Sequence, residues 1–511
     1  MAETGLAELD AWLTSANDVF EIDLLRPNSQ SKPTSALEEP FNPTFTYPIF
    51  GEEETIFGHK GLRIKLSLRA HDLRPSLEIR QDEVFKPIGK TQAMDVKEMM
   101  KDFLPSSAFE NTASKERIDT IGWKPPGTLL TTYKRGGRSF EIWYSSLSKP
   151  EAKEILRGMQ ILVPLFIEGG TLQDLEEAAW TIERWKLFLI YEVTPLKSSP
   201  KSTPYTFVGF STSYRLWVPP TVEISERLSF VSSTPVPLPT LGPNPSDVEH
   251  DKLPPYNPLE SPSRERISQF LILPPFQGQS HGAALYTAMA SLFRSDASVF
   301  EITVEDPNEA FDDLRDWSDL AYLRSTFPSF KTLQVPDSVP AEMLAPKEFI
   351  PVNYLLPPDV ADPIRYKSKI APRQFARLCE MHLLSGIPPL HRSKARITRK
   401  DKSAHENDRR YFFWRLLVKE RLYIRNKDQL VQLDREERIE KVEQTVDSVE
   451  EEYVRLLNAA EKRGHRGTMG EEEAANGKAL ASRGKRKTRV VEEDEDEDED
   501  DTDHSKRIKR A

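Results

Sequence analysis

The sequence predicts an α+β protein with a mixed N-terminal domain, a central domain of strands and helices, a small helical C-terminal domain and a disordered acidic tail. Three observations carry this prediction. Apolar and polar residues alternate over 62–68, the period of two that is typical of a half-buried strand. From about Lys347 the apolar spacing becomes helical, with prolines at the joints. Glu492 to Asp501 is an unbroken run of carboxylates, which cannot bury a core.

The expected elements divide the chain into five segments. Residues 1–45 are mostly irregular, with one possible short helix over 6–12. The other segments, with their expected elements, are the N-terminal domain 46–170 (strands 62–68 and 140–144, helices 95–104 and 152–165), the central domain 171–335 (strands 187–193, 206–217, 266–273 and 299–305, helices 282–293 and 307–320), the helical domain 336–462 (helices 373–384, 409–424 and 439–456) and the tail 463–511. Prolines crowd residues 232–263, which predicts a surface insertion rather than an interior strand or helix.

Composition and charge exclude several classes of protein. The net charge of −11 belongs almost entirely to the acidic run, so the body of the chain is nearly neutral and offers no basic face to nucleic acid. The single cysteine, Cys379, excludes an intramolecular disulfide framework and a Cys-rich zinc site, and we expect no metal. No apolar stretch approaches the ~20 residues of a membrane helix, and the acidic N-terminus lacks a secretory signal. We therefore expect a protein of the cytoplasm and nucleus.

The most informative block begins at a buried strand, 270–273. It passes through Pro274-Pro275-Phe276 into Gln277-Gly-Gln-Ser-His-Gly-Ala283 and then into a helix. Such a loop points backbone N–H groups at whatever lies before the helix, where the helix dipole favours an anion, and glycines let a diphosphate approach closely. A turn of this kind can also be purely structural, so the spacing alone leaves both interpretations open.

The next strand and helix carry a more specific string. Glu301-Ile-Thr-Val-Glu-Asp-Pro-Asn-Glu-Ala-Phe-Asp-Asp-Leu-Arg-Asp316, taken with Phe270 to Gln279, closely resembles the type B histone acetyltransferase catalytic subunit, a member of the GNAT acetyltransferase superfamily. Residues 50–62 and 413–423 resemble the N-terminal domain and the C-terminal helices of the same family. The resemblance covers roughly 40–230 and 264–425. It implies a GNAT fold over 171–335, acetyl-CoA as co-substrate and no metal.

The resemblance also implies roles for individual residues. The general base matches Glu305, with Asp306 beside it and a further carboxylate at Glu168. The acetyl-CoA contacts match Phe270, Leu271, Ile272, Gln277, Gly278, Gln279, Ser280, His281, Gly282, Ala283, Asn308 and Phe311. The histone-tail contacts match Glu52, Glu53, Glu54, Tyr214, Arg215 and Leu216. One departure is notable, because Ser280 stands where the family's loop usually has glycine.

Simpler interpretations stand beside these roles. Asp306 followed by Pro307 and Glu309 reads as a capping box, so Asp306 could be only a helix N-cap. Glu52 to Glu54 could be a solvated loop, and Glu168, next to two glycines, could simply end a helix. His281 is interpreted as a structural donor rather than a catalyst. Cys379 lies on an amphipathic helix and is predicted to be core, which gives no support to an acyl-cysteine mechanism.

The function that the resemblance implies is acetyl transfer to lysines in the N-terminal tail of free, newly synthesised histone H4, by direct attack in a ternary complex. It further implies histone H4 (with H3) and a WD-repeat histone-binding subunit as partners, and roles in DNA repair and telomeric silencing. No direct nucleic-acid contact and no membrane are expected. Two alternatives stay open: a GNAT enzyme with another acceptor, such as a polyamine or protein N-terminus, and a histone chaperone with an acidic tail and a vestigial cofactor site.

Overall fold

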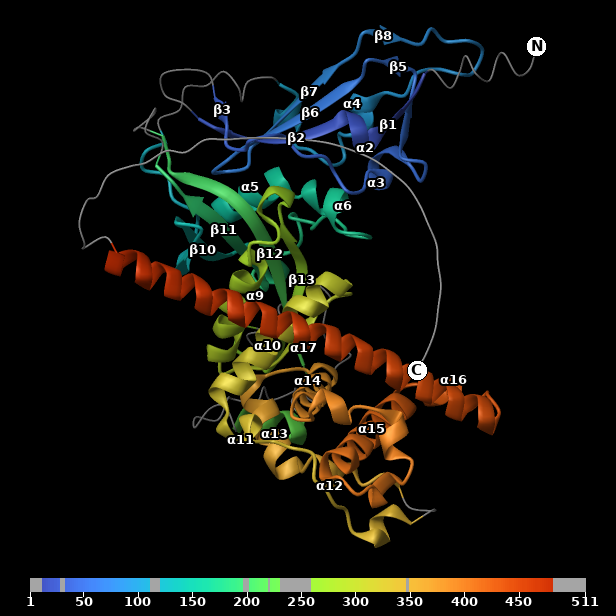
Figure 1. Ribbon diagram of the computed structural model, residues 1–511. Coiled ribbons are helices and arrows are strands. Elements are labelled where there is room, and N and C mark those ends of the chain that lie inside the picture. The colour runs from blue at the N-terminus through green and yellow to red at the C-terminus, as the bar shows by residue number, and fades with distance from the viewer. Residues whose placement is uncertain are drawn as a thin grey trace, which may run out of the picture. The chain divides into compact units, whose positions relative to one another are not determined.

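The structure is a computed structural model that describes residues 12–27, 33–110, 120–195, 202–218, 221–229, 259–345 and 349–480, without the side chains of 222, 225 and 460–480. The chain splits into two compact units, residues 1–453 and 454–511, and the description below concerns the first. It contains both helices and strands, with its described strands before residue 305 and only helices after it, which confirms the predicted α+β class (Figure 1). The expected helix over 6–12, most of the proline-rich insertion and the acidic run lie outside the described residues.

A four-stranded sheet forms the N-terminal part, in the order β3-β2-β6-β7. Its strands are β2 (Phe20–Arg26), β3 (Thr34–Ser35), β6 (Arg63–Arg69) and β7 (Pro75–Arg80), and two small sheets pair β1 (Leu13–Ser15) with β4 (Thr55–Phe57) and β5 (His59–Lys60) with β8 (Glu83–Val84). The alternation over 62–68 becomes β6, whose Ile64, Leu66 and Leu68 are fully buried. Strand β2 pairs in parallel with β6 although it lies in the segment expected to be mostly irregular.

A six-stranded sheet forms the centre, in the order β14-β13-β12-β11-β10-β9. Its strands are β9 (Thr128–Arg135), β10 (Arg138–Ser146), β11 (Trp185–Val193), β12 (Tyr205–Trp217), β13 (Ser263–Ile272) and β14 (Val299–Val304). Only β13 and β14 run parallel, and the other neighbours are antiparallel. All the strands expected between 140 and 305 are confirmed, whereas β9, which is exposed along most of its length, has no apolar alternation and was not predicted. Because β9 and β10 share this sheet, it crosses the expected boundary at residue 170, and the domain limits stay a prediction.

Helices pack against this sheet. Helices α6 (Leu162–Phe166), α8 (Val222–Ser229) and α9 (His281–Ser295) contact its strands, and α10 (Glu309–Thr326) packs on α9. The other helices of this part of the described chain are α2 (Ala16–Val19), α3 (Tyr47–Phe50), α4 (Val96–Met99), α5 (Pro150–Met159) and α7 (Ala179–Ile182), with the single turns η1 (Ser106–Phe109) and η3 (Pro274–Phe276). Leu285, Met289 and Phe293 recur at helical spacing along α9 and are fully buried in the sheet's core. The ring of Phe293 meets that of Phe188 from β11 edge to face, with centroids 5.7 Å apart. The apolar face of α9 is thus held to the sheet, and this holds the loop that precedes it.

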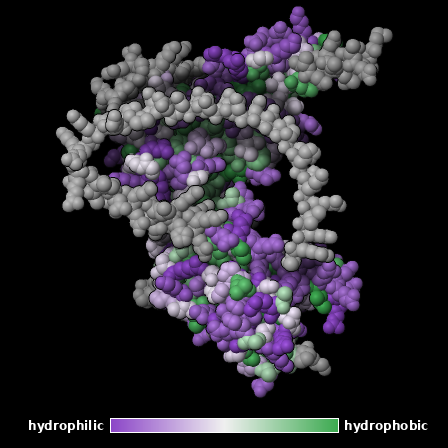
Figure 2. All heavy atoms as spheres, in the orientation of Figure 1, coloured by the Kyte–Doolittle hydropathy of each residue, from purple (hydrophilic) through white to green (hydrophobic). Residues whose placement is uncertain are grey.

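The C-terminal part is helical, as predicted. Its helices are α11 (Pro328–Lys331), α12 (Val352–Leu355), α13 (Pro358–Ser368), α14 (Pro372–Ser385), α15 (Glu406–Arg425), α16 (Lys427–Leu430) and α17 (Arg435–Leu480), with single turns η4 (Ala341–Leu344), η5 (Pro389–His391), η6 (Lys394–Ile397) and η7 (Lys400–Lys402). Cys379 on α14 is completely buried, which confirms that it is core. On the face drawn in Figure 2, this region is mostly hydrophilic with isolated apolar side chains. Helix α17 continues to Leu480, past residue 463 where the tail was expected to begin.

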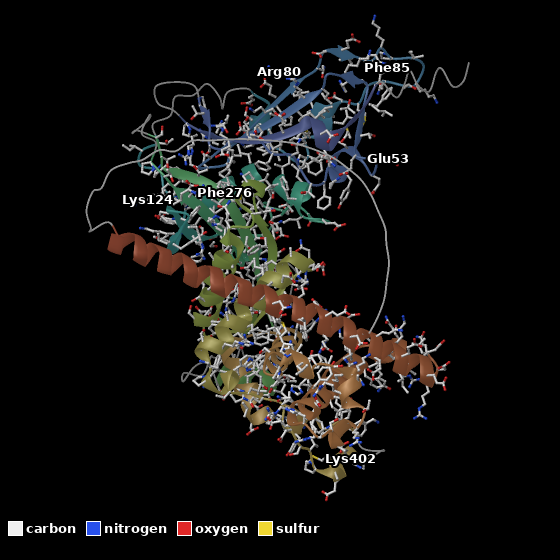
Figure 3. All side chains as sticks on the ribbon, in the orientation of Figure 1. Glu53, Arg80, Phe85, Lys124, Phe276 and Lys402 are labelled. Carbon is white, nitrogen blue, oxygen red and sulfur yellow. The ribbon has the colours of Figure 1, made fainter. Side chains whose placement is uncertain are left out.

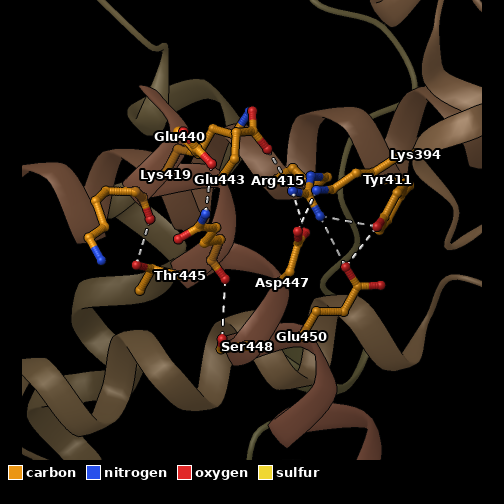
Figure 4. A network of polar contacts seen from close by, with 12 residues as sticks. Lys394, Tyr411, Arg415, Lys419, Glu440, Glu443, Thr445, Asp447, Ser448 and Glu450 are labelled. Atoms are coloured by element: carbon orange, nitrogen blue, oxygen red, sulfur yellow. Dashed lines mark hydrogen bonds and ion pairs between the residues drawn. The ribbon is translucent and has the colours of Figure 1, made fainter. Parts of the chain in front are cut away.

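A polar network joins α15 to the first half of α17. The guanidinium of Arg415, almost fully buried, donates to carboxylates of Glu443, Asp447 and Glu450 at 2.8, 2.8 and 3.2 Å (Figure 4).

The described part of the chain contains no helix that is both long enough and apolar enough to cross a membrane. Among the described residues, no group of three or more His, Cys, Asp or Glu side chains is arranged so that it could hold a metal ion.

Candidate active site

The site is built where strands β13 and β14 separate. Their parallel register ends at Ile267 and Val304, and the last backbone bond between them runs from the Glu305 N–H to the Ile267 carbonyl at 2.9 Å. Strand β13 continues to Ile272 without β14 beside it. Beyond this point the two strands are no longer paired, and the unpaired edge of β13 together with Glu305, where the pairing ends, is here called the opening.

One edge of β13 is available inside this opening. The Gln269 N–H points towards β12, because it donates to Thr212 Oγ1 at 3.2 Å, and the Leu273 N–H donates to the Val208 carbonyl at 3.0 Å. Successive residues of a strand direct their backbone groups to opposite sides, so the N–H groups of Phe270 and Ile272 face the opening. Of the three predicted strand contacts, Leu271 instead pairs with β12 and its side chain is buried. The exposed edge fits an extended ligand that carries amides, such as the pantetheine arm of acetyl-CoA.

The loop after β13 ends at the N-terminus of α9. Gly278 and Ser280 both adopt left-handed backbone conformations, with φ values of 73° and 64°. The side chains of Gln277 and Gln279 brace the loop internally, since they donate to the carbonyls of Ile272 (2.8 Å) and Pro275 (3.1 Å). Ser280 is the N-cap of α9, yet its side chain makes no capping hydrogen bond. The first N–H groups of α9 are therefore left for an anion, as a diphosphate requires.

The left-handed conformation of Ser280 shows what serine costs at a position where the family's loop usually has glycine. A non-glycine residue in the left-handed region costs roughly 1–2 kcal/mol, and glycine in the same place loses more conformational entropy on folding, roughly 0.5–1 kcal/mol. We expect Ser280→Gly to raise the free energy of unfolding by up to about 1 kcal/mol and to leave acetyl-CoA affinity unchanged. Urea unfolding and calorimetric titration measure the two quantities. A clear loss of acetyl-CoA affinity would show instead that the Ser280 hydroxyl contacts the phosphates.

His281, the first residue of α9, lies beneath the loop. It is 1% exposed, and its Nδ1 is 2.8 Å from the hydroxyl of Tyr133 on β9. Burial, followed by the charges of Arg138 and Arg135, lowers the pKa of His281 to about 4. The imidazole is thus neutral and structural, in agreement with its predicted role as a donor rather than a catalyst.

This burial predicts a pH dependence of stability. The folded pKa of about 4 is below the unfolded value of ~6.5, so stability present above pH 6.5 is lost as the pH falls towards 4. We expect the unfolding free energy of a His281→Gln variant to depend less steeply on pH in that window, by up to about 1.4 kcal/mol per pH unit. Urea unfolding between pH 7 and 4.5 measures the slope, and an unchanged slope would mean that folding does not lower the pKa of His281.

Gly282 has a packing role beside the ligand contact that the sequence predicts. A Cβ at this position would lie 2.6 Å from Leu314 Cδ1 of α10, and 3.6 Å from the ring of Phe270. The missing side chain therefore allows α9 and α10 to pack closely, and the contact of Gly282 with a diphosphate stays a prediction. The packing still supports the site, because Phe311 of α10 contacts Phe270 edge to face at 4.9 Å.

We expect Gly282→Val to weaken acetyl-CoA binding and to destabilise the protein by about 1–3 kcal/mol, the usual cost of overpacking. Leu314→Ala in the same chain removes the clashing methyl groups, so the double variant should recover affinity and stability together. Calorimetric titration and urea unfolding of the three proteins test this. If affinity is lost while stability is kept, Gly282 faces the ligand after all.

The carboxylate of Glu305 has two partners within the opening. Ser268 Oγ donates to Glu305 Oε2 at 2.7 Å, and Arg266 Nη2 lies 3.2 Å from Oε1. The Glu305 side chain is 40% exposed, so it is both held in place and accessible to a substrate. Arg266 and Ser268 were not predicted as site residues, although they alternate on one face of the predicted strand. Only the register of β13 against β14 shows that this face meets Glu305.

The predicted capping box beside Glu305 is wrong. Asn308, not Asp306, is the N-cap of α10, because its Oδ1 accepts from the Phe311 N–H at 2.9 Å. Glu309 thus becomes the first helical residue. Asp306 is exposed, with a φ of 33° that is unusual outside glycine, and strain of this kind is often found at functional sites. The geometry removes the cap interpretation of Asp306 and gives Asn308 a structural role.

Glu168 belongs to a turn that contacts β13. It is exposed just after α6, and the carbonyl of Thr171 in the same turn accepts from Gln269 Nε2 at 3.0 Å. The N–H of Gly169 donates to the Tyr47 hydroxyl at 3.0 Å, which ties this turn to α3. Glu168 is thus close in the fold to β13, although no contact joins it to Glu305.

The acidic turn after α3 divides into two roles. Glu52 and Glu53 are exposed, and Figure 3 shows Glu53 at the surface near this turn. Glu54 is an internal brace, since its carboxylate accepts from the Tyr47 N–H at 3.1 Å and from Asn17 Nδ2 at 2.9 Å. A hydrogen bond from the backbone of Thr46, followed by these others, lowers the pKa of Glu54. Glu52 and Glu53 are thus the carboxylates of this turn that have no such internal role among the described contacts.

The predicted contacts on β12 are also unequal. Arg215 is 3% exposed and its guanidinium is occupied by Asp296 at 2.8 Å, which makes it structural. Tyr214 and Leu216 are half-buried, and the ring of Tyr214 packs on Trp185 with centroids 4.8 Å apart. The roles of all these residues towards substrates stay predictions. Ala283, the last of the predicted acetyl-CoA contacts to be placed, is half-buried in the first turn of α9.

Known proteins are similar to this chain over most of its length. A family model described as histone acetyl transferase HAT1 N-terminus matches residues 12–168. The histone acetyltransferase type B catalytic subunit of Aspergillus oryzae is 38% identical, over 98% of this chain and 94% of that protein. This chain belongs to the family of type B histone acetyltransferase catalytic subunits.

Other members of the type B family are identical to this chain to a comparable degree over most of their length. The protein of the same name from Aspergillus fumigatus is 41% identical over 88% of this chain and 78% of its own. The protein of that name from Neurospora crassa is 36% identical over 95% of this chain and 96% of its own length. Membership makes this chain an acetyltransferase that uses acetyl-CoA, and the edge of β13 and the open N-terminus of α9 are the features that fit that ligand.

Proposed function

We propose that this chain transfers acetyl groups to lysine ε-amines in the N-terminal tail of free, newly synthesised histone H4. The observation that carries the proposal is the opening between β13 and β14, which places the accessible carboxylate of Glu305 beside a strand edge and a helix N-terminus suited to acetyl-CoA. When bound, acetyl-CoA supplies an activated acetyl thioester. The N–H groups of Phe270 and Ile272 would hold its pantetheine arm, and the first amides of α9 its diphosphate.

The acceptor lysine presents the main chemical difficulty. A free lysine with a pKa of ~10.4 is neutral in only about one molecule in 2,500 at pH 7, a handicap of ~4.6 kcal/mol. A carboxylate within hydrogen-bond reach, directly or through one water, can accept the proton. Glu305 is the proposed base, because Ser268 and Arg266 orient it while leaving it 40% exposed. Asp306 and Glu168 are the alternative carboxylates.

Acidic side chains around the site favour a basic peptide. Glu52, Glu53, Glu168 and Asp306 are all exposed, and we infer that they attract the lysine-rich histone tail and disfavour neutral acceptors. The nearly neutral body of the chain is consistent with soluble histone rather than nucleosomal DNA as the target. By family resemblance we further propose histone H3 with H4 and a WD-repeat histone-binding subunit as partners, and location in cytoplasm and nucleus.

Titration of the full chain with acetyl-CoA, followed by turnover on acceptors, tests the proposal. We expect acetyl-CoA to bind. We also expect an H4 tail peptide to be acetylated much faster than a polyamine, or than a lysine-free peptide whose only amine is its N-terminal amino group. Fast transfer to the polyamine would identify a different acceptor. Binding of histone without binding of acetyl-CoA would indicate a chaperone with a vestigial site.

A further inference from the structure

The hairpin formed by β9 and β10 carries two arginines at its tip. Arg135 ends β9 and Arg138 begins β10, and the two face each other as a cross-strand pair across Gly136 and Gly137. Both glycines have positive φ values, 52° and 76°, which two-residue hairpin turns require. Like charges placed directly opposite one another destabilise a hairpin. Such a pair becomes favourable where an anion lies between the two guanidinium groups.

The tip reaches the loop that leads into α9. Arg138 Nη2 donates to Gln279 Oε1 at 3.1 Å, and the Tyr133 hydroxyl lies 2.8 Å from His281 Nδ1. Arg138 also pairs with Glu192 at 2.9 Å. Arg135 is exposed, and no carboxylate among the described residues forms an ion pair with it. Arg138 is thus paired with a carboxylate, whereas Arg135 has no ion-pair partner among the described residues.

A groove lies beside Arg135. It has a volume of about 670 Å³ and runs between β9 and α9. Leu130, Tyr133 and Arg135 line one side, and Ala283, Ala284 and Thr287 are among the small residues of α9 on the other. Arg135 is two residues from Tyr133 and therefore shares its face of the strand, towards α9. The groove is large enough for an adenosine and begins in the first turn of α9.

From this placement we infer that Arg135 and Arg138 bind the 3′-phosphate of the adenosine end of acetyl-CoA. The inference rests on the acetyl-CoA site of the proposed function and extends it to a specificity for the 3′-phosphorylated form. In CoA the ribose follows directly after the diphosphate, so a diphosphate at the α9 N-terminus brings the 3′-phosphate near the hairpin tip. Arginine suits this group, because its planar guanidinium makes paired, charge-assisted hydrogen bonds to phosphate.

Calorimetric titration of the full chain with acetyl-CoA and with acetyl-3′-dephospho-CoA tests the inference. Arg135→Gln is the informative variant, because Arg135 is exposed and its loss breaks no described contact, whereas Arg138 also holds Glu192 and Gln279. Lys134→Gln is the matched control, since Lys134 is the adjacent, equally exposed cation on the opposite face of β9. Both variants lose one positive charge from the same strand.

We expect the wild-type chain and Lys134→Gln to prefer acetyl-CoA over the dephospho form by about 10- to 100-fold, the worth of hydrogen bonds to a charged group. In Arg135→Gln this preference should fall several-fold, with the affinity for the dephospho form unchanged. Equal losses for both ligands would assign Arg135 to the diphosphate and overturn the inference. Tight, equal binding of both ligands by the wild-type chain contradicts this inference alone, whereas no binding of acetyl-CoA contradicts the proposed function.

Discussion

We expect Glu305→Gln to lower turnover on a histone H4 tail peptide by about 10²–10⁴-fold, the usual effect of losing a general base. The amide keeps the size of the carboxylate and can still accept from Ser268 Oγ, but it cannot take a proton from the lysine. Acetyl-CoA affinity should barely change, because the groups suited to that ligand are backbone amides of β13 and α9. Part of the activity should return at high pH, where more of the substrate lysine is already neutral.

Two further variants separate chemistry from structure. Glu309→Gln, which also removes an exposed carboxylate at the start of α10, should leave turnover nearly unchanged. Ser268→Ala retains the carboxylate but frees it to rotate, so it should lower turnover less than Glu305→Gln and keep the shape of the pH profile. A loss of less than tenfold in Glu305→Gln, with an unaltered pH profile, would transfer the role to Glu168 or Asp306. The double substitution would then show whether they share it.

The second large effect concerns stability. We expect Arg415→Met to lower the free energy of unfolding by about 3 kcal/mol, because removing one partner of a buried ion pair leaves the others uncompensated. Arg415 is 2% exposed, while Glu450 is 13% exposed and Glu443 and Asp447 about a third, so the expected loss is at the lower end of the range for buried pairs. Lys419 and Lys394 still contact Glu443 and Asp447, and this limits the loss further.

Urea unfolding followed by circular dichroism measures this loss. Arg410→Met on the same helix is the control, because Arg410 makes a loose ion pair with Glu406, at 3.8 Å, and a hydrogen bond to Asn407 Oδ1, at 3.2 Å, within its own helix, and its loss should cost less than about 1 kcal/mol. Adding Glu450→Gln to Arg415→Met removes one of the stranded charges and should recover part of the stability. Similar losses for both arginines would mean that α17 is held by its apolar contacts rather than by the network in Figure 4.

Much of the fold could be read from local patterns. The strands that became β6, β11, β12 and β13 alternate or bury apolar residues over short runs, and α9 shows helical spacing that is independent of its neighbours. Strand β9 could not be found in this way, because it lies exposed at the edge of the sheet and is held by pairing to β10. Strand β2 likewise depends on a parallel partner that is distant in the sequence.

The candidate site shows the same division. The order strand, loop, helix, strand and the place of Glu305 at the end of the last strand could be predicted from the chain, because these depend on local periodicity and on a specific string of residues. Which of several equally polar side chains is available depends instead on contacts between distant segments. The fold placed Arg215 and Glu54 in internal contacts, made Asn308 the cap in place of Asp306, and brought Arg266 and Ser268 to Glu305. The physical reason is that a polar side chain binds whichever partner the fold brings within about 3 Å, and such partners are set by strand register and helix packing rather than by neighbours in the chain.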